Sequence, residues 1–107
     1  MKYKRVLLKI SGESLSGNET YGISTQMLDY YASEIKTGYD KHLQIGVVIG
    51  GGNIFRGLQG ADKGFNRIQG DYMGMLATVI NSLALQAQLE AVGIKSVVLS
   101  GLAIDPL

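Results

Sequence analysis

The sequence predicts an α/β fold: a three-layer sandwich built on a mainly parallel β-sheet. Three short apolar runs rich in Val, Ile and Leu alternate with two longer segments of helical periodicity. Apolar character that is nearly continuous along each run is typical of strands covered on both faces, as in parallel sheets. A chain of 107 residues, 46% of them hydrophobic, is long enough for one compact domain.

The predicted strands are short, and each is followed by glycine. They span Val6–Ile10, Ile45–Ile49 and Lys95–Leu99. The residues that follow them are, in order, Ser11-Gly12, Gly50-Gly51-Gly52 and Ser100-Gly101. Parallel strands are joined by crossovers, which bring their carboxyl ends to one edge of the sheet. We therefore expect three glycine-containing strand exits to form a shared floor at that edge.

The first predicted helix lies between the first two strands. It begins at Ser24 or Thr25, either of which can cap it, because the apolar residues that follow recur on one helical face. Two ends are possible, one at Gly38 and one a turn later near His42, which we expect at the end of the helix.

The second predicted helix runs from about Asp71 to Val92, with Gly93 as its left-handed terminator. It is apolar almost all round, so we expect it to be buried on two sides, inside the domain or against another subunit. Residues 72–89 carry no charge, but Thr, Asn, Ser and Gln interrupt them. A membrane-spanning helix is therefore not expected.

Composition excludes several classes of function. Net charge is +1 with both signs mixed along the chain, whereas nucleic-acid binding needs a clustered basic patch. The absence of cysteine excludes disulfides and thiolate metal sites, and one histidine cannot make a histidine-rich site. The apolar run after the basic N-terminus is too short for a signal peptide. We expect a soluble, cytoplasmic protein with no metal site of its own, no nucleic-acid partner and no membrane partner.

The strand exits carry the residues with a chemical role. Glycine there lets backbone N–H groups approach an anion without interference from a Cβ atom. Lys9 lies at the end of the first strand in an apolar run, where burial is costly unless an anion pairs with it. Arg56 follows the second exit, in the first turn of a short predicted helix. At ~4 Å and an effective dielectric constant of about 20, one such charge pair contributes about 4 kcal/mol.

Plainer interpretations of the same residues exist. Lys9 could reach water from a sheet edge, three consecutive glycines could form only a turn, and Arg56 could be a solvated surface residue. Their occurrence together at strand ends favours an anion site. Two known phosphate motifs do not fit, because no Lys-Ser/Thr follows Gly57 as a P-loop requires, and Phe55 stands where the dinucleotide fingerprint needs glycine.

Asp71 also has two interpretations. A carboxylate at a helix N-terminus is favoured by the helix dipole alone. The functional alternative is a carboxylate that accepts hydrogen bonds from ribose hydroxyls. Tyr72, Met73 and Met75 are expected in a core or an interface. No serine stands in a nucleophile elbow, so a Ser–His–Asp hydrolase has no support.

Three segments of the chain resemble the bacterial UMP kinases (uridylate kinases), a family within the amino-acid-kinase superfamily. They are Lys9-Ile10-Ser11-Gly12-Glu13, residues 47–57 with the run Gly50-Gly51-Gly52-Asn53, and the run Gly70-Asp71-Tyr72-Met73-Gly74-Met75-Leu76-Ala77-Thr78. The lysine and glycine pattern is shared across the superfamily, whereas the third run is specific to the UMP kinases. The resemblance extends from about Tyr3 to the end of the chain.

The resemblance implies ATP-dependent phosphorylation of UMP to UDP, a step of pyrimidine nucleotide biosynthesis, with Mg²⁺ accompanying ATP. Lys9 and Arg56 would be the catalytic residues, and Gly51 and Asp71 would hold UMP, the latter by its ribose. The residues implied on the ATP side are Lys9, Ile10, Ser11, Gly12, Gly52 and Arg56. An allosteric response to GTP is implied for Gly17, Asn18, Glu19, Thr20, Tyr21 and Gly22, and the family forms hexamers.

The chain also departs from the family. Members are more than twice as long, so residues 1–107 would be the N-terminal, monophosphate-binding part of one kinase domain. The C-terminal nucleotide-binding half would be absent, the fold incomplete and the fragment alone inactive. The segment around Gln86, Ala87 and Glu90 lacks the charged pattern that some members use at the GTP site.

Two alternative functions remain open. One is a superfamily relative that phosphorylates a carboxylate such as carbamate or N-acetylglutamate, although such a substrate has no ribose for Asp71 to hold. The other is non-enzymatic: a catalytically incomplete nucleotide-binding or assembly module.

Overall fold

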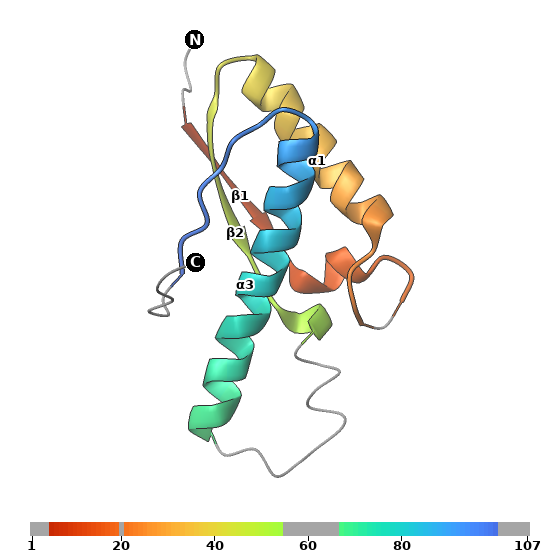
Figure 1. The fold of residues 1–107 in the computed structure, drawn as a ribbon, viewed down its shortest axis with the longest axis vertical. Helices are drawn as coiled ribbons and strands as arrows, with labels where there is room; N and C mark the ends of the chain where they lie inside the picture. Colours follow the sequence, from red (N-terminus) through yellow and green to blue (C-terminus); the bar gives the residue numbers. More distant parts are fainter. Residues whose placement is uncertain (1–4, 20, 55–66, 101–107) are drawn as a thin grey trace.

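The structure is a computed structural model that describes residues 5–19, 21–54 and 67–100. In chain order its elements are strand β1 (Arg5–Ile10), the 3₁₀ helix η1 (Gly12–Ser16), helix α1 (Thr25–Asp40), strand β2 (Gln44–Ile49) and helix α3 (Arg67–Ala91) (Figure 1). Residues 52–54 are also helical. The predicted α/β class is confirmed.

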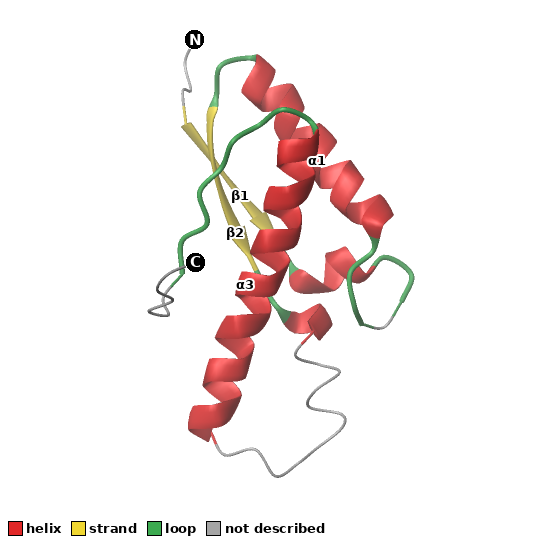
Figure 2. Ribbon diagram, viewed as in Figure 1, coloured by secondary structure: helices red, strands yellow, loops and turns green. Residues whose placement is uncertain are grey.

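The two strands pair in parallel, from Arg5 opposite Gln44 to Ile10 opposite Ile49. Helix α1 is the crossover that parallel pairing requires. One hydrophobic core contains side chains from both long helices and from alternate strand residues, so α1 and α3 cover the same face of the sheet (Figure 2). The buried members of that core are Ile10, Leu15, Leu28, Ala32, Ile35, Leu85, Leu89 and Ile94.

Helix α1 begins as the sequence predicts. The Ser24 hydroxyl caps it by accepting the Met27 N–H at 3.3 Å. Of the two predicted ends the later one is correct: the helix runs to Asp40, and His42 then adopts a left-handed φ of 67°. The His42 N–H donates to the Tyr39 carbonyl and the Leu43 N–H to the Gly38 carbonyl, the two bonds of a Schellman motif.

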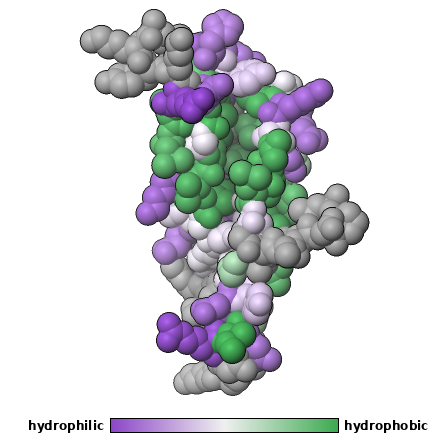
Figure 3. Space-filling view, turned by 90° about the vertical axis from the view of Figure 1, so that its left-hand side faces the viewer, coloured by the Kyte–Doolittle hydropathy of each residue, from purple (hydrophilic) through white to green (hydrophobic). Residues whose placement is uncertain are grey.

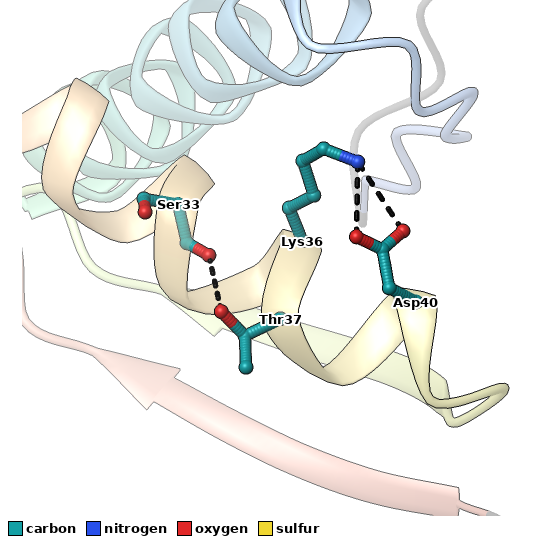
Figure 4. A network of polar contacts seen from close by, with 4 residues as sticks. All are labelled: Ser33, Lys36, Thr37 and Asp40. Carbon is teal, nitrogen blue, oxygen red and sulfur yellow. Dashed lines mark hydrogen bonds and ion pairs between the residues drawn. The ribbon is translucent and has the colours of Figure 1, made fainter.

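Surface pairs decorate the last turns of α1 (Figure 4). Lys36 Nζ lies 3.0 Å from Asp40 Oδ2, with both side chains about half exposed, and the Thr37 hydroxyl donates to the Ser33 carbonyl at 3.1 Å. An exposed ion pair of this kind stabilises a helix by only about 0.3–0.5 kcal/mol. The end of α1 is therefore set by its backbone bonds.

Helix α3 begins at Arg67, so the predicted start near Asp71 is wrong by about one turn. Gly70 costs a helix only about 1 kcal/mol relative to alanine and does not end it here. The predicted terminator is confirmed: Gly93 has φ 87°, and the Ile94 N–H donates to the Leu89 carbonyl at 2.9 Å.

The third predicted strand is not formed. Residues 94–100 run without regular secondary structure, and Val97 and Leu99 are 82% and 88% exposed. A groove of about 590 Å³, lined by β2, α1, α3 and this segment, separates it from β2, so no ladder of hydrogen bonds joins the two. Figure 3 shows hydrophobic side chains gathered on this side of the molecule.

The second face of the sheet is open among the described residues, contrary to the expectation of cover on both faces. Leu7 is 74% and Val48 50% exposed there, while their neighbours Leu8 and Val47 pack against the core. The described residues thus form a sheet with one helical layer.

Helix α3 has one buried and one exposed apolar side. Its inward side buries Ala77, Asn81, Leu85 and Leu89, and Val79 is also buried, away from that side. The outward side exposes an apolar stripe, defined here as Ile68, Tyr72, Leu76, Ile80 and Leu83. The predicted burial of a second side is therefore only partial: Val79 is buried on that side, and the stripe around it is exposed. Neither α3 nor any other helix in that part is long and apolar enough to span a membrane.

Candidate functional site

The first two strand exits meet at the carboxyl end of the sheet. The Gly50 N–H donates to the Ile10 carbonyl at 3.0 Å, which carries the pairing of β1 and β2 one residue past the strands. A parallel sheet places its ligand crevice at this end of the strands. The third exit is only partly described, because Ser100 is placed but Gly101 lies outside the described residues.

Gly12 is the point of closest approach between the two exits. A methyl group on its Cα would lie 2.5 Å from the Gly52 nitrogen and 2.9 Å from the Gly50 carbonyl carbon. No side chain fits there without moving backbone, and Gly12 is buried. An anion-binding nest is made of neighbouring backbone N–H groups, and this packing places the Gly52 nitrogen beside Gly12.

Gly51 is held against helix α3. A Cβ atom at this position would lie 2.8 Å from the Ala77 Cβ and 3.1 Å from the Thr78 nitrogen. Glycine is therefore required here for helix packing, whatever the ligand. The same contact fixes the distance between the floor and the rest of α3.

Asp71 lies on α3 with its side chain exposed. It precedes Thr78 by seven residues, or about two helical turns, so both residues face the same way and are separated by about 10 Å along the axis. The α3 atoms nearest Gly51 are the Ala77 Cβ and the Thr78 nitrogen, so Asp71 lies about two turns along the helix axis from the floor. Arg56, the other charged residue predicted here, lies outside the described residues.

Lys9 projects from the open face of the sheet. Its neighbour Ile10 is 2% exposed on the helix-covered face, and side chains alternate along a strand. Lys9 itself is exposed, so the expected cost of burying its charge does not arise in the described structure. The reason is that no described element covers this face.

Ser11 begins helix η1. Its hydroxyl accepts the Ser14 N–H at 3.2 Å, and its carbonyl accepts the Ser14 hydroxyl at 2.8 Å. Tyr31 of α1 then donates its hydroxyl to Ser14 Oγ at 2.8 Å. The first exit is therefore braced from α1, while Ser11 remains exposed.

The segment 17–22 leads from η1 toward α1. Gly17 and Gly22 both have left-handed φ values, 62° and 91°. Tyr21 is 64% exposed, and Thr20 lies outside the described residues. The end of the segment reaches the floor, because the Gly22 N–H donates to the Asn53 carbonyl at 2.9 Å.

Two residues that the sequence analysis did not assign lie beneath the floor. Asn53 and Asn81 are both fully buried and join their amides, with Asn81 Nδ2 donating to Asn53 Oδ1 at 2.7 Å and Asn53 Nδ2 donating to Asn81 Oδ1 at 3.1 Å. The sequence did contain a signal, since Asn81 lies on the inward face of an uncharged helix. A buried amide requires hydrogen-bond partners, so a partner such as Asn53 could have been sought.

Within the described ranges, no group of three or more His, Cys, Asp or Glu side chains lies close enough to hold a metal ion. The described groups at the two exits are backbone N–H donors and the exposed charges of Lys9 and Glu13. Such a site suits an anionic group that is positioned and not covalently attacked.

Comparisons with known proteins agree with this geometry. The chain is 59% identical over 106 residues to the uridylate kinase of Bacteroides thetaiotaomicron and 61% identical over 105 residues to that of Porphyromonas gingivalis. These alignments cover 99% and 98% of this chain but 45% and 44% of the relatives. The chain thus spans less than half the length of the curated relatives it matches.

Solved structures show the same fold. The UMP kinase of Ureaplasma parvum matches with a TM-score of 0.84 and 35% identity, over 98% of this chain and 44% of that one. The UMP kinase of Bacillus anthracis matches with a TM-score of 0.74 and 40% identity, over 83% and 36%. The sequence profile of the amino acid kinase family matches residues 4–106, and the chain belongs to that family.

Proposed function

We propose that the protein transfers the terminal phosphoryl group of ATP to UMP, forming UDP and ADP. The observation that carries the proposal is the contact of Gly12 with Gly50 and Gly52, which packs two glycine turns where only backbone donors fit. The relatives that match this site are named uridylate kinases. Positioning and charge neutralisation are what phosphoryl transfer requires of a protein.

The residue roles follow the two exits. The turn Lys9–Gly12 and residue Gly52 would contact the phosphates of ATP through their backbone, with Lys9 and Arg56 offsetting charge that develops on the transferred group. Gly51 would hold UMP and Asp71 its ribose. The separation of about 10 Å between Asp71 and the floor leaves room for a nucleoside between them.

Mg²⁺ would accompany ATP as part of the substrate. The exposed Glu13 lies beside Gly52, since a Cβ atom on Gly52 would lie 3.6 Å from Glu13 Oε1. A carboxylate so close to a phosphate site repels the free anion. A divalent cation travelling with the phosphates would offset that repulsion.

The roles assigned to this chain are those of one part of a kinase domain. Residues 1–107 would supply the monophosphate and phosphate sites, and the remainder of the domain would supply most of the nucleoside-triphosphate site. On that basis we expect the isolated chain to bind UMP weakly and to lack kinase activity. The complete protein is proposed to carry out the reaction in the cytoplasm.

The outward apolar stripe of α3 favours self-association. Five large side chains are 40–69% exposed along one helical face that carries no charge from Tyr72 to Leu83. A patch of this kind marks an interface. We propose a homo-oligomer, a hexamer by family resemblance, with GTP acting as an effector through the segment 17–22.

An ADP-release assay tests the function against its alternative. The protein expressed from the complete reading frame that contains this sequence is given ATP and Mg²⁺ with UMP, CMP, carbamate or N-acetylglutamate in turn. Turnover of UMP is expected. Turnover of a carboxylate without UMP would favour the carboxylate-phosphorylating relative, and nucleotide binding without any turnover would favour the binding module.

Two substitutions in the complete protein test the assigned roles. Lys9→Ala should lower kcat by about 100-fold or more, because a charge that stabilises the transition state is lost. Asp71→Ala should chiefly raise the KM for UMP, by about 10- to 100-fold, because one charged hydrogen bond is worth roughly 1.5–3 kcal/mol. Steady-state kinetics separate the two effects, and equal effects of both substitutions on ATP alone would contradict the roles.

A further inference from the structure

The buried amides of Asn53 and Asn81 use every hydrogen that they carry. Each Nδ2 donates one bond to the other amide. The second bond of Asn53 goes to the Gly22 carbonyl at 2.7 Å, and the second bond of Asn81 goes to the Gly50 carbonyl at 2.8 Å. The pair therefore ties together three stretches of chain: the segment 17–22, the glycine floor and helix α3.

The bond to Gly50 has a directional consequence for the floor. A trans peptide group is planar, so the carbonyl of one residue and the N–H of the next point in opposite directions. Because Asn81 holds the Gly50 carbonyl toward α3, the Gly51 N–H must point away from that side chain. Asn81 therefore sets the orientation of a donor in the floor without touching a ligand itself.

Gly22 is tied to the same point by two bonds. The Asn53 carbonyl accepts the Gly22 N–H at 2.9 Å, and the Asn53 side chain donates to the Gly22 carbonyl. Gly22 has room around it, since nothing lies within 4 Å of a Cβ placed there. Two hydrogen bonds to Asn53 therefore hold its backbone in position.

Stability alone does not require this arrangement. Replacing both partners of a buried hydrogen bond by apolar groups of similar shape can be nearly neutral, whereas removing one partner costs about 1–3 kcal/mol. An apolar pair would fill the same space, but it could not hold the carbonyls of Gly50 and Gly22. What the two amides add is the orientation of those peptide groups.

We propose that Asn53 and Asn81 are positioning residues that aim the Gly51 N–H at the phosphate of the nucleoside monophosphate and anchor Gly22 to the same turn. The proposal rests on the proposed function for the identity of that ligand. The hydrogen bonds that carry it are independent of the function.

Kinetics of Asn81→Leu in the complete protein test the positioning role. If the Gly51 N–H binds the monophosphate equally in the ground and transition states, a substitution that misaligns it should raise KM with little change in kcat. We expect the KM for UMP to rise at least about 10-fold. A purely structural role would instead lower the fraction of folded enzyme, which reduces apparent kcat and leaves KM unchanged.

Two further variants serve as controls. Leu85→Ala lies one turn further along the same helix, in the buried core, and should destabilise the protein by about 2–5 kcal/mol without raising KM. The double variant Asn53→Leu/Asn81→Leu should regain much of the thermal stability that Asn81→Leu loses. Its KM for UMP should nevertheless remain above the wild-type value. A wild-type KM in the double variant, or an equal rise of KM in Leu85→Ala, would overturn the proposal.

An activity-independent readout separates this inference from the proposed function. The NMR signal of the Gly51 amide is followed while inorganic phosphate is added to the complete protein. A shift in the wild type that disappears in Asn81→Leu supports the positioning role even if UMP is not turned over. An identical shift in both proteins refutes it, as does the absence of any shift in the wild type.

Discussion

At the carboxyl end of the sheet, a methyl group on Gly12 would lie 2.5 Å from backbone, whereas nothing lies within 4 Å of a Cβ on Gly93, where α3 ends. The first region encloses two fully buried amides. At the second, a groove lined by α1, β2, α3 and residues 94–99 leaves apolar side chains uncovered. The region that carries the proposed chemistry thus has the tightest backbone packing, at Gly12 and Gly51, whereas the turn at Gly93 has room for a side chain.

Gly12→Ala should cause the largest loss of stability of the substitutions that test this difference between the two ends of the sheet. The added methyl group meets backbone atoms of Gly50 and Gly52 that cannot rotate away, so the two exits must separate. Overpacking of this kind costs about 3 kcal/mol or more. We expect a large fall in the thermal midpoint of the complete protein and loss of UMP turnover.

Gly46→Ala is the matched control for that substitution. Gly46 lies in β2 of the same sheet, and its nearest neighbour to an added Cβ is the flexible side-chain end of Leu7 at 3.4 Å. Its thermal midpoint should therefore remain close to that of the wild type. Equal losses of stability at Gly12 and Gly46 would show that the exits are no more tightly packed than the strand.

Gly51→Ala should have the next largest effect, about 2 kcal/mol, because its methyl group would lie 2.8 Å from the Ala77 Cβ. Ala77→Gly removes that obstacle at a helix-propensity cost of about 1 kcal/mol. Thermal unfolding of both single variants and the double variant should therefore show a favourable coupling above about 1 kcal/mol. Additive losses would mean that the floor does not rest on α3 at this point.

Sequence reasoning was most successful where local chemistry decides the outcome. The Ser24 cap and the Gly93 terminator depend on a few neighbouring residues, and both are found. The parallel pairing is also found, because a strand–helix–strand order leaves few other topologies. The start of α3 was misplaced because Gly70 resembles a boundary yet does not end the helix.

Features that depend on distant contacts were not predictable in the same way. Lys95–Leu99 has the composition of a strand, but strand formation needs a neighbour within hydrogen-bonding distance, and a groove lies between it and β2. The exposure of Lys9 depends on which elements cover the sheet. The pairing of Asn53 with Asn81 joins residues 28 positions apart, so only the structure reveals that the two amides satisfy each other.

Gly93→Ala should have a smaller effect at the opposite end. There is space for the methyl group, so the cost comes only from the φ of 87°, which a residue with a Cβ adopts at about 1–2 kcal/mol. Part of this free-energy cost is offset, because alanine leaves the unfolded chain less conformational freedom than glycine does. We expect a net loss of about 1 kcal/mol in thermal unfolding and an unchanged KM for UMP. A KM that rises would show that the two ends are coupled.

His42→Gly should have the smallest effect, with the opposite sign. The same two backbone bonds close α1 as close α3, but here a residue with a side chain holds the left-handed φ of 67°. Glycine would relieve that strain, while its greater freedom in the unfolded chain offsets roughly 0.5–1 kcal/mol of the gain. We expect a net stabilisation of about 0.5 kcal/mol, measured by thermal unfolding, with UMP kinetics unaffected. His42 is exposed, so its side chain is not expected to stabilise the fold. A loss of stability would mean that the side chain makes a contact whose energy exceeds the backbone strain. The end of the sheet near His42 would then tolerate substitution less well than its open packing indicates.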